Sequence, residues 1–148
     1  MELQYINYFE NTDLQKSYTI FDENENEIGS AEAFGTELGF LVTVIKIFNP
    51  KFQKMGLGFQ AFKKVFDEIS HHVPITVIVG SWHRGGEFQE FEDGMSSNMK
   101  VFRESQNERI EDRAFSTPTG KWAKRLGFNN CRILSNGYDE VTVHFTKE

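Results

Sequence analysis

The sequence predicts an α+β or α/β fold, with a mixed central sheet of about six to seven strands and two or three helices. Two observations support this class. Apolar, strand-like segments separated by polar turns fill the first 48 residues, and two helical segments follow, each leading into further strands. At 148 residues, the length favours a single domain spanning 1–148 with one sizeable core.

The amino-terminal third reads as successive strands. Residues 3–9, 17–22 and 27–34 have strand character, and 39–48 is a long, nearly continuous apolar run suited to a central strand. The polar run 22–26 superficially resembles a calcium loop. It has Glu27 where that loop needs glycine and Ala33 where it needs glutamate, so a hairpin turn is favoured.

A glycine turn follows the central strand. Pro50 ends the apolar run, and Gln53, Gly56 and Gly58 lead into a helix. Glycines let the backbone approach a ligand closely, and a helix N-terminus attracts phosphate. The chain contains no P-loop, and Ala61 replaces the third glycine of a dinucleotide fingerprint. A structural turn without a ligand is the alternative interpretation.

The helix after this turn is amphipathic. Its apolar residues recur at steps of three and four at Phe59, Phe62, Phe66 and Ile69. His71 and His72 suit its C-terminal end, and a short buried strand is expected at 75–79.

Residues 82–115 are predicted to be an insertion between the fifth strand and the last helix. Met95, Met99 and Phe102 share one helical stripe. We expect this stripe to pack on the domain as part of a lid whose acidic residues face an opening; a solvated loop is the alternative. Those acidic residues are Glu87, Glu90, Glu92 and Asp93.

The last helix has clear boundaries. Thr117 and Pro118 suit its first residues, and Gly127 suits its end. Asn136 and Gly137 then predict a tight hairpin between strands at 132–134 and 141–145.

The pattern Gln53-x-x-Gly56-x-Gly58 resembles the acyl-CoA loop of the GNAT superfamily of N-acetyltransferases, and Leu126-Gly127-Phe128 is similar to the end of that family's last helix. The resemblance implies a GNAT-like fold with a splayed central strand and acetyl-CoA as co-substrate. It assigns cofactor binding to the turn and, more weakly, to Ser116 and Lys124. The turn residues are Phe48, Gln53, Lys54, Met55, Gly56, Leu57 and Gly58.

The chain also departs from the family pattern. Ala123 stands where many members have a tyrosine that protonates the leaving thiolate. The two helices that usually follow the first strand have no room between it and the second. Ser81 and His83, expected just after the fifth strand, are the remaining candidates for catalysis, because an imidazole titrates near neutral pH.

Two functions follow. One is an acyl-CoA-dependent N-acyltransferase, which uses acetyl-CoA to modify a small amine or a protein amine. The other is a GNAT-like domain without turnover, acting as an acyl-CoA-binding or protein-interaction module.

The composition bears on partners. The net charge of −6 argues against nucleic acid. No apolar run is long enough for a membrane span, and we expect no metal site. Cys131 is the only cysteine and the N-terminus lacks the features of a signal peptide, so a cytoplasmic location is expected. A homo-oligomer is compatible with the sequence.

Overall fold

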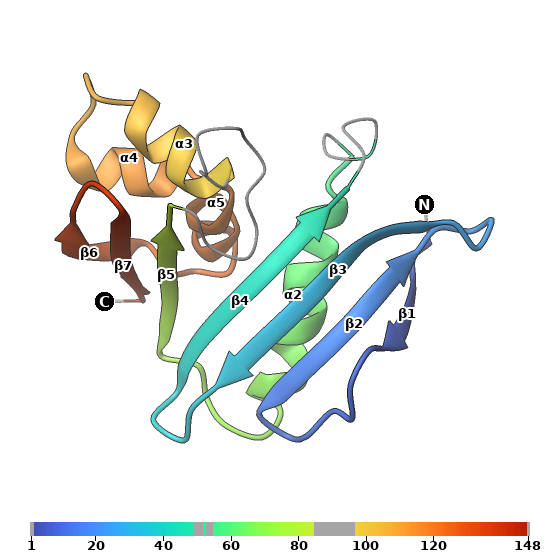
Figure 1. Ribbon diagram of the computed structural model, residues 1–148. Helices are drawn as coiled ribbons and strands as arrows, with labels where there is room; N and C mark the ends of the chain where they lie inside the picture. The colour runs from blue at the N-terminus through green and yellow to red at the C-terminus, as the bar shows by residue number, and fades with distance from the viewer. Residues whose placement is uncertain (1, 49–51, 53–54, 85–96, 148) are drawn as a thin grey trace. The chain divides into compact units, whose positions relative to one another are not determined.

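A computed structural model describes residues 2–48, 52, 55–84 and 97–147. The chain divides into two compact units, 1–75 and 76–148, and each is described here by itself. The described residues contain seven strands, within the predicted range, and four helices, more than the two or three expected (Figure 1).

The first unit is an antiparallel four-stranded sheet with one helix on it. Each strand pairs with the next in sequence, and Figure 1 shows helix α2 lying along one face. The register places Ala31 between Tyr18 on one side and Ile45 on the other. The elements are β1 (Gln4–Asn7), β2 (Gln15–Phe21), β3 (Glu27–Gly35), β4 (Phe40–Ile47) and α2 (Leu57–Ser70).

Alternation along the strands explains which face carries α2. Tyr18, Ile20, Ala31 and Ala33 are all buried, and the register puts them on the same face. At the end of β3, a Cβ on Gly35 would lie 2.7 Å from Cγ2 of Ile69 on α2. Small residues on β3 therefore let the helix lie close to the sheet.

The buried stripe of α2 differs from the predicted one. Leu57, Ala61, Phe62, Val65 and Ile69 are buried, whereas Phe59 and Phe66 of the predicted stripe are only half-buried. The phenylalanines have helical spacing, but the stripe they form is rotated around the helix axis from the buried stripe, which packs on the small residues of β3. His71 is the C-cap of α2, as expected for this end.

The polar run 22–26 forms the predicted hairpin turn. The buried carboxylate of Asp22 accepts hydrogen bonds from the backbone N–H groups of Asn24 and Asn26, each at 2.9 Å. The side chain of Asp22 thus stabilises the turn between β2 and β3.

The second unit has three antiparallel strands and three helices. Strand β7 pairs with β5 on one side and β6 on the other. Strand β5 continues to His83, so the first two residues of the predicted insertion 82–115 belong to a strand. The elements are β5 (Val77–His83), α3 (Ser97–Glu104), α4 (Ile110–Ser116), α5 (Pro118–Arg125), β6 (Asn130–Asn136) and β7 (Glu140–Thr146).

The described part of the insertion is helical and packed. Met99 and Phe102 on α3 are fully buried, as predicted, and the Phe102 ring lies 6.1 Å from that of Trp82 on β5. Met95 and the four acidic residues proposed to face an opening lie outside the described residues. For 97–116, the structure has two short helices in place of the alternative solvated loop.

Helix α5 begins and ends as predicted. Thr117 is its N-cap: the Thr117 hydroxyl accepts a hydrogen bond from the Gly120 N–H at 3.0 Å, and Pro118 follows. At the other end Gly127 has φ +92°, and the Phe128 N–H donates to the Ala123 carbonyl at 3.0 Å. This pattern, with the Gly127 N–H bonded to Lys124, is a Schellman motif.

Helices α4 and α5 meet closely at a glycine. A Cβ on Gly120 would lie 2.1 Å from the carbonyl oxygen of Ala114. Only glycine fits at this position with the two helices in this arrangement.

The predicted terminal hairpin is present, with a different turn. Residues 137–139 connect β6 and β7, and the Gly137 N–H donates to the Glu140 carbonyl at 2.9 Å. Gly137 does not adopt a positive φ, so this is not the two-residue turn that Asn136-Gly137 typically forms. None of the described helices is long and apolar enough to cross a membrane.

Candidate functional site

The glycine turn of the first unit ends at Gly56. This residue is the N-cap of α2, with φ 75° and ψ 12°, a left-handed conformation that favours glycine. The Gln60 N–H donates to the Gly56 carbonyl at 3.2 Å, which closes the first turn of α2. No described atom lies within 4 Å of where a Cβ of Gly56 would stand. The positive end of the α2 dipole lies at this glycine, and such a helix N-terminus favours an anionic ligand.

The other turn residues divide by exposure. Met55 is 48% exposed, whereas Leu57 is 1% exposed and anchors the turn in the core. Gly58 is half-buried in the first turn of α2. Gln53 and Lys54 lie outside the described residues, so their predicted roles stay predictions.

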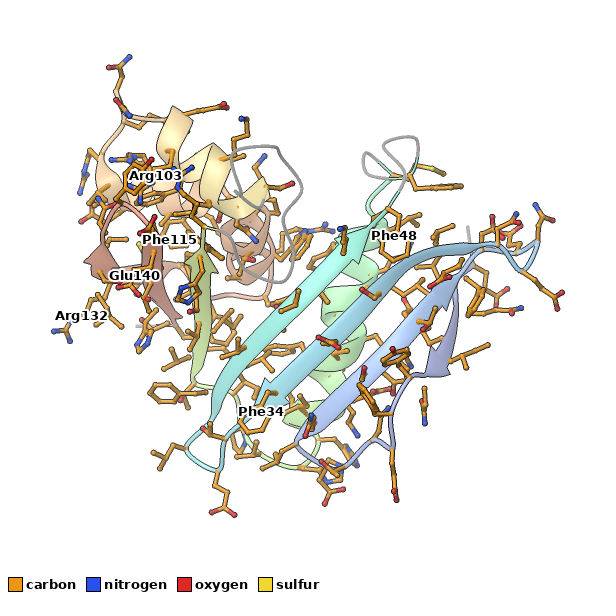
Figure 2. All side chains as sticks on the ribbon, viewed as in Figure 1. Phe34, Phe48, Arg103, Phe115, Arg132 and Glu140 are labelled. Atoms are coloured by element: carbon orange, nitrogen blue, oxygen red, sulfur yellow. The ribbon has the colours of Figure 1, made fainter. Side chains whose placement is uncertain are left out.

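Phe48 directly follows β4, and its side chain is labelled in Figure 2. The Phe48 N–H donates to the Ile28 carbonyl at 2.8 Å. This donor is therefore already used within the unit, so the Phe48 N–H cannot pair with a ligand as an added strand would.

Ser81 and His83 lie within β5. The prediction from the sequence, which placed them just after this strand, was wrong. Both are exposed and alternate with buried Gly80 and Trp82, so the polar residues mark one face of a strand and not a loop. The Ser81 hydroxyl lies 3.1 Å from Nε2 of His83. This hydrogen bond holds the His83 ring in one orientation on an exposed surface.

A pocket of about 710 Å³ lies between α4 and α5 in the second unit, and we call it the basic pocket. It is lined by Asp112, Phe115, Ser116, Lys121, Lys124 and Arg125. The pocket brings together Ser116 and Lys124, the two weaker cofactor-binding candidates. Its volume is in the usual range for a small-molecule site.

The polar groups of the basic pocket are unequally available. The Ser116 hydroxyl donates to the Asp112 carbonyl at 2.8 Å, which leaves its oxygen as an acceptor. The Lys124 ammonium lies 5.4 Å from the centre of the Phe115 ring, which is labelled in Figure 2. Three cations and one carboxylate favour an anionic ligand, and Phe115 offers an aromatic face.

Sequence reasoning missed Phe115, Lys121 and Arg125. The spacing of Lys121, Lys124 and Arg125 was a usable signal, because residues three and four apart share one helix face. Phe115 gave no such signal, since it was placed at the edge of the insertion.

No family model matches the chain, and neither does any curated protein. Solved structures do match. The ribosomal-protein-S18-alanine N-acetyltransferase from Escherichia coli has a TM-score of 0.51 and 14% identity, over 92% of this chain and 71% of that one. A GCN5-related N-acetyltransferase from Kribbella flavida has a TM-score of 0.51 and 11% identity, over 92% and 69%. The chain has the GNAT fold.

The GNAT fold confirms the predicted superfamily resemblance and the α+β class. A nourseothricin acetyltransferase is similar to the same degree, with a TM-score of 0.51 and 8% identity over 90% of this chain and 66% of that one. At such identities the likeness establishes the fold alone, and function has to be argued from the site.

Among the described residues, no three His, Cys, Asp or Glu side chains gather to hold a metal ion.

Ala123 has no exposed surface and lies inside α5. The resemblance places a proton-donating tyrosine at this position in many GNAT members. A methyl group buried here cannot supply a proton, so any acid or base must come from other residues.

Proposed function

We propose that this protein is an acyl-CoA-dependent N-acyltransferase that uses acetyl-CoA to acylate an amine. The observation that carries the proposal is the left-handed Gly56 at the N-terminus of α2, within the segment whose sequence matches the GNAT loop pattern. The GNAT fold supports it. The N–H groups at the start of α2 would bind the pyrophosphate of the cofactor.

The basic pocket of the second unit suits a phosphorylated nucleoside, such as the adenosine 3′-phosphate end of CoA. Lys121, Lys124 and Arg125 suit a phosphate, and Phe115 suits stacking against the adenine ring. Lys124 and Arg125 also suit the negative end of α5, because both lie in its last turn, and this would be their role without a ligand. A comparison of cofactors with and without the 3′-phosphate separates these two roles.

His83 is the base in this proposal. The amine nitrogen attacks the thioester carbonyl carbon, His83 takes a proton from that nitrogen, and the carbon–sulfur bond breaks. The imidazolium then returns the proton to the leaving thiolate. Ser81 is a positioning residue, because its hydroxyl fixes the orientation of the His83 ring.

A second candidate function rests on Ala123. If no residue replaces the missing tyrosine, the chain is a GNAT-like domain that binds acyl-CoA without transferring the acyl group. Both functions keep the cofactor site, and they differ only in turnover.

Calorimetric titration with acetyl-CoA, followed by assays of thiol release, tests both steps. We expect saturable binding, and a stability gain of about 2.7 kcal/mol when acetyl-CoA reaches 100 times its dissociation constant. Thiol release is then measured with a panel of polyamines, amino sugars and peptides with free N-termini.

Binding with amine-dependent thiol release would support the transferase. Binding without release for any amine would favour the second function. Unchanged melting and no heat of binding at millimolar acetyl-CoA would contradict both.

A further inference from the structure

A polar groove of about 570 Å³ lies in the first unit, where the C-terminal end of α2 faces β1 and β2. Lys16 and Tyr18 line it from β2, and Asp67 and Glu68 line it from α2. Helix α2 has 14 residues, so about 20 Å separates this end from Gly56 at the other. The groove is therefore distinct from the glycine turn, and the inference does not rest on the proposed function.

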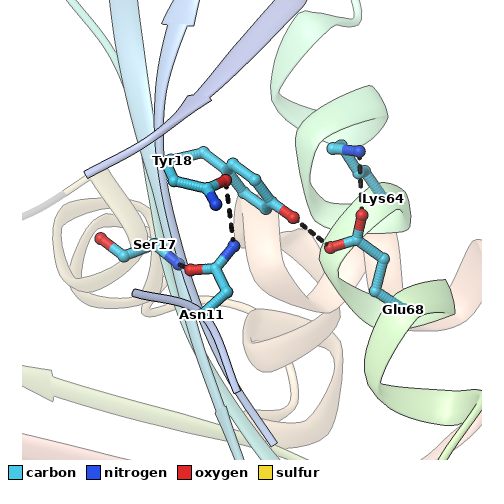
Figure 3. Close-up of polar contacts among 6 residues, drawn as sticks. Asn11, Ser17, Tyr18, Lys64 and Glu68 are labelled. Atoms are coloured by element: carbon cyan, nitrogen blue, oxygen red, sulfur yellow. Dashed lines mark hydrogen bonds and ion pairs between the residues drawn. The ribbon is translucent and has the colours of Figure 1, made fainter. Parts of the chain in front are cut away.

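The floor of the polar groove is a fixed hydrogen-bonded network, shown in Figure 3. The Tyr18 hydroxyl donates to Oε1 of Glu68 at 2.6 Å, and the Lys64 ammonium donates to Oε2 at 2.9 Å. Asn11 accepts a hydrogen bond from the Ser17 N–H at 2.9 Å. Both oxygens of Glu68 are thus engaged, and the floor holds its shape without a ligand.

Lys64 is held from a second side. Its ammonium lies 4.8 Å from the centre of the Tyr5 ring and 5.1 Å from that of Tyr18. Burial, and then Glu68, raise the pKa of Tyr18 to about 12, so its phenol stays a hydrogen-bond donor at physiological pH. The network therefore keeps Glu68 and Lys64 paired with each other.

Two charged groups that line the polar groove can still bind a ligand. The half-buried Lys16 makes no ion pair or hydrogen bond through its ammonium among the described residues. Asp67 uses one oxygen, Oδ2, in a 2.6 Å pair with Lys63, and its Oδ1 has no partner in the same part of the chain. The groove therefore presents one ammonium and one carboxylate oxygen.

We infer that the polar groove binds a zwitterion, an amino acid or short peptide whose ammonium pairs with Asp67 and whose carboxylate pairs with Lys16. A ligand with only a negative charge would meet Asp67, Glu68 and the negative end of α2. One with only a positive charge would meet Lys16 and leave its ammonium unpaired. Selectivity arises from these repulsions as well as from the two attractions.

Every residue that lines the polar groove carries a polar or charged group at the end of its side chain. His71 and His72 lie at the exposed rim, and Nε2 of His72 is 3.5 Å from Oδ1 of Asp13. Amides, imidazoles and charged groups at the ends of these side chains can orient a small molecule that carries both charges.

The test is an NMR titration of the whole chain with four related probes. These are L-alanyl-L-alanine, its N-acetylated form without the ammonium, its C-terminal amide without the carboxylate, and free L-alanine. We expect the dipeptide to shift the resonances of Lys16, Asp67 and the two histidines. Each singly charged form should bind at least tenfold more weakly. Binding of L-alanine would identify a free amino acid as sufficient, and its failure beside the dipeptide would identify a peptide.

Two variants assign the charges. Lys16→Gln should weaken dipeptide binding and bring it to the level of the amide form, and Asp67→Asn should bring it to the level of the N-acetylated form. Lys46→Gln and Glu32→Gln are matched controls. They remove the same charges from β4 and β3 at positions that the register puts on the opposite face of the sheet. Both controls should bind the dipeptide as the wild type does.

Three results would overturn the inference. The first is the absence of shifts in the polar groove with the dipeptide and with L-alanine at millimolar concentrations. The second is equal binding of the dipeptide and its amide, which would make the groove a simple amine site. The third is an equal loss in the control variants, which would assign the effect to net charge.

Discussion

The hydroxyl of Ser81 and Nε2 of His83 lie 3.1 Å apart on the exposed face of one strand. If His83 is the base, His83→Gln should lower kcat for acyl transfer by about 10²-fold while the dissociation constant for acetyl-CoA is unchanged. Ser81→Ala should lower kcat by only about tenfold, the equivalent of one hydrogen bond that orients the ring. Steady-state kinetics and calorimetry on the same samples check both.

Ser135→Ala on β6 is a suitable control, because it removes a serine hydroxyl elsewhere in the second unit. If His83→Gln kept full activity, His83 could not be the base. The proposed cofactor site would be unaffected by that result.

Gly56→Ala should abolish most acetyl-CoA binding. Alanine in a left-handed conformation costs about 1–2 kcal/mol, and its methyl group would occupy the open space beside the start of α2. We expect the dissociation constant to rise at least tenfold by calorimetry.

Gly127→Ala is its matched control, because Gly127 also has a positive φ with no described atom within 4 Å of its Cβ position. It should lose similar thermal stability and keep its affinity. Equal affinities of the two variants would mean that Gly56 serves the turn alone.

Lys124→Gln should reduce the preference for CoA over 3′-dephospho-CoA. A charge-assisted hydrogen bond to phosphate contributes about 1.5–3 kcal/mol, so the preference should fall roughly tenfold or more. Lys147→Gln is the control, since the Lys147 ammonium also lies over a ring, that of Phe128 at 5.2 Å, and does not line the basic pocket. An unchanged preference in Lys124→Gln would place the 3′-phosphate elsewhere.

Tyr18→Phe should lower the free energy of unfolding by about 1.5–3 kcal/mol, because Glu68 loses a hydrogen bond to a charged group. The pKa of Tyr18 is raised in the folded state, to about 12, first by burial and then by Glu68. This contribution is therefore complete below pH 10 and is lost as the pH rises toward 12.

Urea titrations between pH 8 and 11.5 measure the effect. The wild type should lose more stability than Tyr18→Phe across this range, whereas Tyr138→Phe, at an exposed hairpin tip, should follow the wild type. Parallel curves for wild type and Tyr18→Phe would show that the hydroxyl makes no stabilising bond.

Thr117→Ala should destabilise the chain by about 1–2 kcal/mol, the usual effect of losing an N-cap. The loss is at the upper end because the buried hydroxyl also donates to the Ala114 carbonyl at 2.7 Å. Calorimetry should show a fall in Tm of roughly 3–6 °C. Thr117→Ser keeps the hydroxyl and should recover most of it; failure to recover would assign the effect to the lost methyl group.

Local signals predicted most of the fold. Thr117, Pro118 and Gly127 bounded α5 correctly, because capping depends on a few neighbouring residues. The buried stripe of α2 was harder to predict. Its orientation depends on which residues of β3 are small, a tertiary fact that the spacing of Phe59, Phe62 and Phe66 does not contain.

The candidate site was predicted unevenly for the same reason. Gly56 was found because its conformation is required by the turn itself. Ser116 and Lys124 were named separately, and only the packing of α4 against α5 brings them into one pocket with Phe115. The Ser81–His83 hydrogen bond required recognising that β5 continues past Val79, and the exposed serine and histidine obscured that continuation.

The close packing at Gly120 determines which amino-acid substitutions this position accepts. With the Ala114 carbonyl 2.1 Å from any added Cβ, even alanine at 120 would force the two helices apart and distort the wall of the basic pocket. In a saturation-mutagenesis library, position 120 should therefore accept no replacement. Position 127, where only the backbone angle is demanding, should accept asparagine. Among the library members that still fold, position 120 would therefore always be glycine, whereas position 127 would be glycine or asparagine.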